Sequence, residues 1–266
     1  MFIATSIFVQ AQTQKIKIQF EGNKVFSSDV LLQKLNTLLP DDSHWNSKYD
    51  EDQLRYCLEK TVLVFLRSEG YLMARIGELK TESDERNLTV TVPIKEGIIH
   101  RLGNVKIKGT KFFTPEQLLQ QLSFKKGGIF DAKDLREWLF ERVKAMYENN
   151  GYIEQDVESN PTLKPATAKI EYGIVDLTIV IDEGQQFTVS QIEFVGNGQA
   201  SEPYLKTLMF LKEGEIFNKQ LLVDGFKKLD ELNLFERINY DKYVSLVKDD
   251  EKSLVKIKIE VRELKP

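Results

Sequence analysis

The sequence predicts an α+β protein made of three tandem βααββ modules, each a three-stranded mixed sheet covered on one face by two helices, in an elongated array. Three observations lead to this prediction. Short segments recur at a fixed step along the chain, and the same order of strand-like and helix-like apolar patterns follows each of them. In addition, the longer helix of every module opens with the same capping signature.

The repeat is clearest at its glycines. Gly22, Gly109 and Gly196 lie 87 residues apart, each directly after a strand-like segment. The same step relates two further pairs of segments: Ile129-Phe130-Asp131 with Ile216-Phe217-Asn218, and Ile94–Gly97 with Ile181–Gly184. Several landmarks that share one period indicate repeated structural units.

Each module is expected to begin with a strand and a short helix. In the first module, Ile16, Ile18 and Phe20 alternate with polar residues, which is typical of a strand with one buried face. In the second module, Thr114 and Gln117 have the spacing of a capping box around Pro115 and therefore predict the start of the short helix.

The longer helix is predicted by its first turn. Asp50, Asp131 and Asn218 are favourable N-cap residues, each preceded by an aromatic residue and followed four positions later by leucine. This pattern is a hydrophobic staple, in which the aromatic and the leucine pack together at the helix entry. Gly70 and Gly151 then end the helix in the first two modules.

Two strands are expected to complete each module. The penultimate strands are predicted near 71–79, 152–159 and 237–246, and the last strands at 88–94, 175–181 and 254–261. Branched apolar residues are more frequent in the last strands. We therefore expect the last strand to be central in its sheet and the penultimate strand to be an edge.

The predicted modules cover residues 15–97, 98–184 and 185–266, and short turns join them with limited hinge bending. Residues 1–14 are expected to be a partial signal peptide, because Phe2–Val9 is mostly apolar and Val9-Gln10-Ala11 fits a cleavage site. A basic segment is missing before the apolar stretch, so a plain N-terminal tail is the alternative.

Composition narrows the classes of function. The chain has 37 Lys and Arg against 41 Asp and Glu, a formal charge of −4, which disfavours nucleic acid as a partner. One cysteine, Cys57, and two histidines, His44 and His100, are too few for a cysteine and histidine zinc site. We therefore expect no metal site and no cofactor.

The ordered set of motifs resembles POTRA (polypeptide-transport-associated) domains, the periplasmic modules of outer-membrane assembly proteins of the BamA type and of two-partner secretion transporters. The resemblance covers residues 15–264. The residues that carry it are the three glycines after the first strands, the aromatics before the long helices, Gly70-Tyr71, Gly151-Tyr152, Leu234-Phe235-Glu236 and the closing Glu96, Glu183 and Glu263.

The resemblance implies a non-catalytic segment on the periplasmic face of a bacterial outer membrane, secreted through the inner membrane. It implies binding of nascent outer-membrane proteins, contact with its own or a partner β-barrel on the C-terminal side, and docking of periplasmic chaperones or lipoproteins. Two alternatives stay open: the POTRA segment of a two-partner secretion transporter, and a free-standing periplasmic adaptor without a barrel.

Sheet edges are the candidate binding sites, because an extended peptide can add to an edge through main-chain hydrogen bonds that are indifferent to its sequence. The candidate edges are 72–76, 153–157 and 238–243. The residues expected to contact a bound chain are Leu72, Arg75, Ile153, Gln155, Val157, Ile238, Tyr240, Lys242 and Tyr243. The alternative is that charged side chains protect these edges from other strands.

No catalytic residues are expected. His44 and His100 have no evident nucleophile nearby in the sequence and are interpreted as solvated residues. Cys57 lies within the apolar stripe of a predicted helix and is interpreted as a small buried residue.

Overall fold

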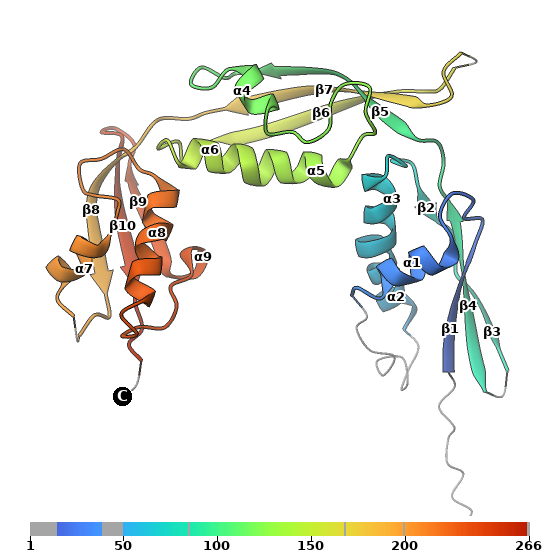
Figure 1. Cartoon of the computed structure of the whole chain (residues 1–266), viewed down its shortest axis with the longest axis horizontal. Coiled ribbons are helices and arrows are strands. Elements are labelled where there is room, and N and C mark those ends of the chain that lie inside the picture. Colours follow the sequence, from blue (N-terminus) through green and yellow to red (C-terminus); the bar gives the residue numbers. More distant parts are fainter. Residues whose placement is uncertain (1–14, 39–49, 85, 168, 199, 265–266) are drawn as a thin grey trace, which may run out of the picture. The chain divides into compact units, whose positions relative to one another are not determined.

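The computed structural model describes residues 15–38, 50–84, 86–167, 169–198 and 200–264 (Figure 1). The predicted signal peptide or tail, 1–14, and His44 lie outside these residues. Contacts group the chain into two compact units, one with 1–104, 124–134 and 162–176 and the other with 105–123, 135–161 and 177–266. The division into three modules at 97 and 184 stays a prediction.

Three small mixed sheets contain the strands (Figure 1). The first sheet has the order β1–β4–β2, with β3 also paired to β4, and the others have the orders β5–β7–β6 and β8–β10–β9. The strands of the first sheet are β1 (Lys15–Glu21), β2 (Arg75–Ile76), β3 (Lys80–Ser83) and β4 (Asn87–Lys95). The others are β5 (His100–Lys108), β6 (Asp156–Lys164), β7 (Gly173–Asp182), β8 (Thr188–Val195), β9 (Val244–Asp249) and β10 (Leu254–Glu260).

The predicted strand order is confirmed. The last strand of each module is central, parallel to the first strand in the β1–β4 and β8–β10 pairs and antiparallel to the penultimate strand in the β4–β2 and β10–β9 pairs. One detail of the prediction is wrong, because the first sheet has four strands. Its penultimate strand is interrupted at residues 77–79, so β2 and β3 pair separately with β4.

The helices begin where the capping residues predict. Asp50 accepts a hydrogen bond from Gln53 N at 3.0 Å and Asn218 accepts one from Leu221 N at 2.9 Å, and Thr114 and Gln117 form the expected capping box. The first two modules contain α1 (Ser28–Leu35), α2 (Glu51–Leu58), η2 (Glu59–Leu63), α3 (Val64–Ser68), α4 (Pro115–Leu119), α5 (Ala132–Glu137), η3 (Trp138–Val143) and α6 (Lys144–Glu148). The third contains α7 (Glu202–Leu208), α8 (Lys219–Asp230) and α9 (Tyr240–Tyr243).

The long helices of the first two modules each contain a π-helical turn, η2 or η3, which an apolar period of 3.6 residues does not predict. A π turn accommodates one extra residue in the helix while keeping apolar residues on the core side. In η3, Trp138, Leu139 and Val143 are all buried, and Trp138 Nε1 donates to Leu118 O at 2.9 Å.

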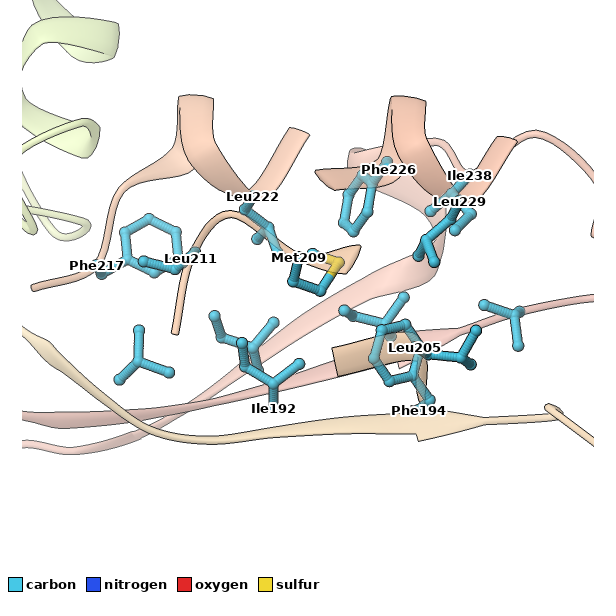
Figure 2. Packing of buried hydrophobic residues seen from close by; sticks show 14 of the residues in the cluster. Ile192, Phe194, Leu205, Met209, Leu211, Phe217, Leu222, Phe226, Leu229 and Ile238 are labelled. Carbon is cyan, nitrogen blue, oxygen red and sulfur yellow. The ribbon is translucent and has the colours of Figure 1, made fainter. Parts of the chain in front are cut away.

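The core of the third module lies between α8 and its sheet. Figure 2 shows Leu222, Phe226 and Leu229 of α8 pointing toward Ile192 and Phe194 of β8. A separate cluster forms the core of the first module, with Leu31, Leu35, Leu54, Leu58, Val90 and Val92 fully buried. Each such leucine contributes about 1.5–3 kcal/mol on burial, so these helix faces hold the helices on the sheets.

The joints between modules contain more than turns. His100 N donates to Gly70 O at 2.8 Å, and 87 residues later Phe187 N donates to Gly151 O at 2.9 Å. His100 is buried, with 4% of its surface exposed, and its Nδ1 lies 3.3 Å from Gly70 O. The expectation of a solvated His100 is therefore wrong. Backbone hydrogen bonds hold the ends of the first two long helices to the segments that follow the predicted joints.

Candidate functional site

The outer strands β6 and β9 and the broken edge formed by β2 and β3 are the candidate binding edges. Each has one strand neighbour in the described sheets, β7, β10 and β4 respectively. On the side of such a strand that faces away from its neighbour, the backbone N–H and C=O groups have no partner within the sheet and can pair with an added chain.

Strand β6 is the longest of these edges and has no interruption. Its nine residues are exposed except for the half-buried Val157. The strand contains Pro161, which an outer strand tolerates because the missing N–H is not needed by a neighbour on that side. The apolar pattern predicts an end at 159, but the strand continues to Lys164.

Charged groups tie the far end of β6 to its sheet. Lys164 on β6 forms an ion pair with Asp176 on β7, and Asp176 Oδ1 also accepts from Asn104 N on β5 at 2.7 Å. The Lys164 hydrogen bond, followed by the Asn104 bond, holds the pKa of Asp176 below its usual range. The three strands are therefore linked across their open face while the outer edge of β6 stays exposed.

Strand β9 offers a shorter edge. Val247 has 57% of its surface exposed, whereas the side chains of Val244 and Leu246 pack against the core. Lys248 forms an ion pair with Glu154, and this bond raises the pKa of the Lys248 ammonium. That ion pair links one end of β9 to Glu154, two residues before β6.

The edge of the first sheet is broken. Arg75 and Ile76 form β2, Gly77 N then donates to Pro93 O at 2.8 Å, and pairing resumes only at Lys80. An extended peptide would therefore meet two short strands, which makes this edge less suitable than β6.

The structure places two of the predicted contact residues, Arg75 and Val157, on edge strands. The strand assignment is wrong for the other seven. Leu72 and Ile153 lie in turns, Gln155 precedes β6, Ile238 is a buried loop residue, and Tyr240, Lys242 and Tyr243 form α9. The binding role of all nine residues stays a prediction.

Local capping explains the error in the third module. Asn239 accepts a hydrogen bond from Lys242 N at 3.1 Å and starts α9, so the strand begins only at Val244. Tyr240 then packs on the core with Lys219 Nζ 4.5 Å from its ring centroid, and burial raises the pKa of its hydroxyl. The missed edge, 158–164, could have been found by allowing proline in an outer strand.

A buried carboxylate lies at the end of the central strand in two modules. Glu183, after β7, accepts from Lys111 N at 2.9 Å, Phe112 N at 3.0 Å and Tyr147 Oη at 2.8 Å. Burial and then the Glu183 bond raise the pKa of Tyr147. Glu96 likewise accepts from the backbone N–H groups of Lys24, Val25 and Phe26. These bonds hold loop backbone and, at Glu183, the buried Tyr147 hydroxyl, so we interpret the carboxylates as structural.

Other functional groups are few in the described part of the chain. Cys57 is buried as expected, and burial raises the pKa of its thiol. Among the described residues, no group of three or more His, Cys, Asp or Glu side chains could hold a metal ion. In the same residues, no helix has the length and apolar character needed to cross a membrane.

Comparison with known families agrees with this architecture. The model of the POTRA family, described as a surface antigen variable number repeat, matches residues 100–184 and 187–264, more than half of the chain. The chain belongs to the POTRA family. The two matched segments contain β5–β7 and β8–β10 with their helices, so this POTRA chain has the family signature on two of its three sheets.

Relatives and solved structures share the fold. The outer membrane protein assembly factor BamA of Neisseria meningitidis is 23% identical over 231 residues, which cover 84% of this POTRA chain and 28% of the relative. The crystal structure of Haemophilus influenzae BamA POTRA3-5 superposes with a TM-score of 0.68 at 24% identity, covering 94% of this chain and 96% of that one. The chain spans 28% of that BamA and 27% of a putative outer membrane protein assembly factor of Treponema pallidum, so it covers only part of the length of these relatives.

Proposed function

We propose that this chain is the periplasmic POTRA segment of an outer-membrane protein assembly factor. In this role it binds unfolded outer-membrane proteins and accessory proteins, and it works as a binding module without catalysis. The similarity to BamA proteins across 84% of the chain supports the proposal. The observation that carries the binding mechanism is the exposed, uninterrupted edge of β6.

Main-chain pairing suits clients of many sequences. A peptide that adds beside β6 forms backbone hydrogen bonds, each with a net contribution of about 0.5–1.5 kcal/mol, whatever its side chains are. Strands of outer-membrane barrels alternate apolar and polar residues over about ten positions. A chain of this pattern can pair along β6, Asp156–Lys164, except at Pro161, which has no N–H to donate.

Amide NMR on the labelled full chain tests the proposal. The probe is a synthetic peptide of about ten residues that alternates apolar and polar side chains, and the control is the same peptide with proline at every second position. We expect the alternating peptide to shift amide signals of residues 158–160 and 162–164, and the proline peptide to leave them unchanged because it lacks donors. Shifts confined to the helices, or equal shifts with both peptides, would refute binding at this edge.

A further inference from the structure

A small hollow on the second compact unit lies between the end of one long helix and the start of the next. Its lining comes from η3 and α6 on one side and from the first turns of α8 on the other. The apolar lining residues are Phe140, Ala145 and Val223, and the polar ones are Glu141, Lys144, Glu148, Asn149, Lys219 and Gln220. This hollow is separate from the edge of β6.

Phe140 is the unusual residue at this site, because 55% of its surface is exposed while its neighbours Trp138 and Leu139 are buried. The equivalent positions in the other modules are the exposed Glu59 in η2 and Lys227 in α8. The first module has the same π turn with a charged residue at this position, so the fold does not require an aromatic side chain here. An exposed aromatic at a place where the fold accepts a charge is typical of a contact residue.

The joint beside the hollow is firmly held. Asn149 Oδ1 accepts from Gln220 N at 2.9 Å, and Asn218 Nδ2 donates to Asn149 O at 2.7 Å. The first turn of α8 is therefore fixed to the end of α6. Such a preformed hollow loses little conformational entropy when a partner binds.

The charges around the hollow leave one group without a partner. Glu148 is nearly buried and has Lys219 Nζ at 2.9 Å and Lys144 Nζ at 3.8 Å. Within the described residues, Glu141 is in no ion pair. The surface therefore combines an apolar floor, an exposed aromatic ring and one unpaired carboxylate.

We propose that this hollow docks a partner protein through an aliphatic side chain next to an arginine. The aliphatic group fills the floor between Ala145 and Val223. The arginine pairs with Glu141 and stacks on the ring of Phe140, which its planar guanidinium favours over the lysine ammonium. The inference rests on the proposed function for the class of partner, an accessory protein, and the hollow adds the pair of side chains that this partner must present, in contrast to the sequence-tolerant clients of the β6 edge.

Site-specific photo-crosslinking in the full-length protein, expressed in its own host, tests the proposal. A benzoylphenylalanine residue replaces Phe140, and the control replaces Lys227, an exposed helix position of the same unit. We expect at least about tenfold more crosslinked protein from position 140, because contact residues near the centre of an interface dominate binding. Sequencing of the crosslinked peptide should show an arginine adjacent to an aliphatic residue.

Charge variants then test the arginine contact. In the protein with the crosslinker at 140, Glu141→Gln should reduce the yield about threefold to tenfold. The matched change Glu251→Gln, at an exposed acid outside the hollow, should leave the yield unchanged. Equal yields at 140 and 227, a crosslinked peptide without arginine, a lipid or second copy as the product, or equal effects of the two charge variants would each overturn the proposal.

Discussion

The glycine that follows the first strand of each module permits a test of why glycine recurs at this position. Gly196 has φ +94°, and a Cβ at this position would lie 2.3 Å from Val261 O, the carbonyl that follows the central strand. Gly214, in the same module, has φ +87° and would place a Cβ with nothing within 4 Å. A comparison of the alanine variants at Gly196 and Gly214 therefore separates the effect of backbone strain from that of steric overlap.

The expected magnitudes follow from this geometry. Alanine at either position adopts a left-handed conformation that costs about 1–2 kcal/mol, partly offset by about 0.4–1 kcal/mol from a stiffer unfolded chain. Gly214→Ala should thus destabilise the third module by about 1 kcal/mol. Gly196→Ala must also displace Val261, whose N–H donates to Val195 O at 2.8 Å. Overpacking and a weakened hydrogen bond add about 2 kcal/mol or more.

Hydrogen exchange on the full chain measures the difference in the amides of β8 and β10. Exchange through opening of this core should be about fivefold faster in Gly214→Ala than in the original protein. In Gly196→Ala it should be at least about thirtyfold faster than in Gly214→Ala, since 1.4 kcal/mol is a factor of ten. The first module serves as an internal reference and should exchange at the original rate in both variants. If Gly196→Ala accelerates exchange no more than Gly214→Ala, the contact with the Val261 carbonyl does not explain the glycine.

Two further predictions concern ionisable groups in the second compact unit. Because the folded pKa of Tyr147 is raised above its unfolded value, its stabilising contribution is complete below about pH 10 and decreases as the pH rises further. The thermal midpoint should therefore fall more steeply above about pH 10 in the original protein than in Tyr147→Phe, and parallel curves would contradict the buried hydroxyl. Lys219→Met should destabilise more than Glu148→Gln, because it leaves a nearly buried carboxylate with only the more distant Lys144, and the double variant should show a coupling of about 1 kcal/mol. A coupling near zero, measured by hydrogen exchange in α8, would mean that this ion pair contributes nothing to the joint.

Local capping and the repeat made most of the fold predictable. Asp50, Thr114 and Asn218 each cap the helix that the sequence assigned to them, because a cap depends only on residues three or four positions away. The central position of the last strands also followed from their branched residues.

Features that depend on tertiary contacts were not predictable in the same way. The π turns η2 and η3 keep buried residues such as Trp138 on the core side of the helix, and a period of 3.6 residues conceals the extra residue. Strand β6 extends through Pro161 because its outer side has no neighbour, which a single sequence does not reveal. The hollow at Phe140 depends on the approach of α6 and α8, and its only sequence signal is an aromatic where the other modules have Glu59 and Lys227.

The glutamates that follow the central strands, Glu96 and Glu183, hold only one side of their sheets. Glu183 follows the central strand β7, and its carboxylate accepts from backbone N–H groups of the loop after β5. The order β5–β7–β6 places that loop on one side of β7 and the outer strand β6 on the other. The carboxylate therefore fixes β5 to β7 without contributing to the β6 side. A peptide can pair with β6 while these bonds remain intact, so binding at this edge need not open the module. The repeat of Glu96 and Glu183 at the step of 87 residues thus has a physical reason, because in both modules the carboxylate holds the loop after the first strand to the end of the central strand.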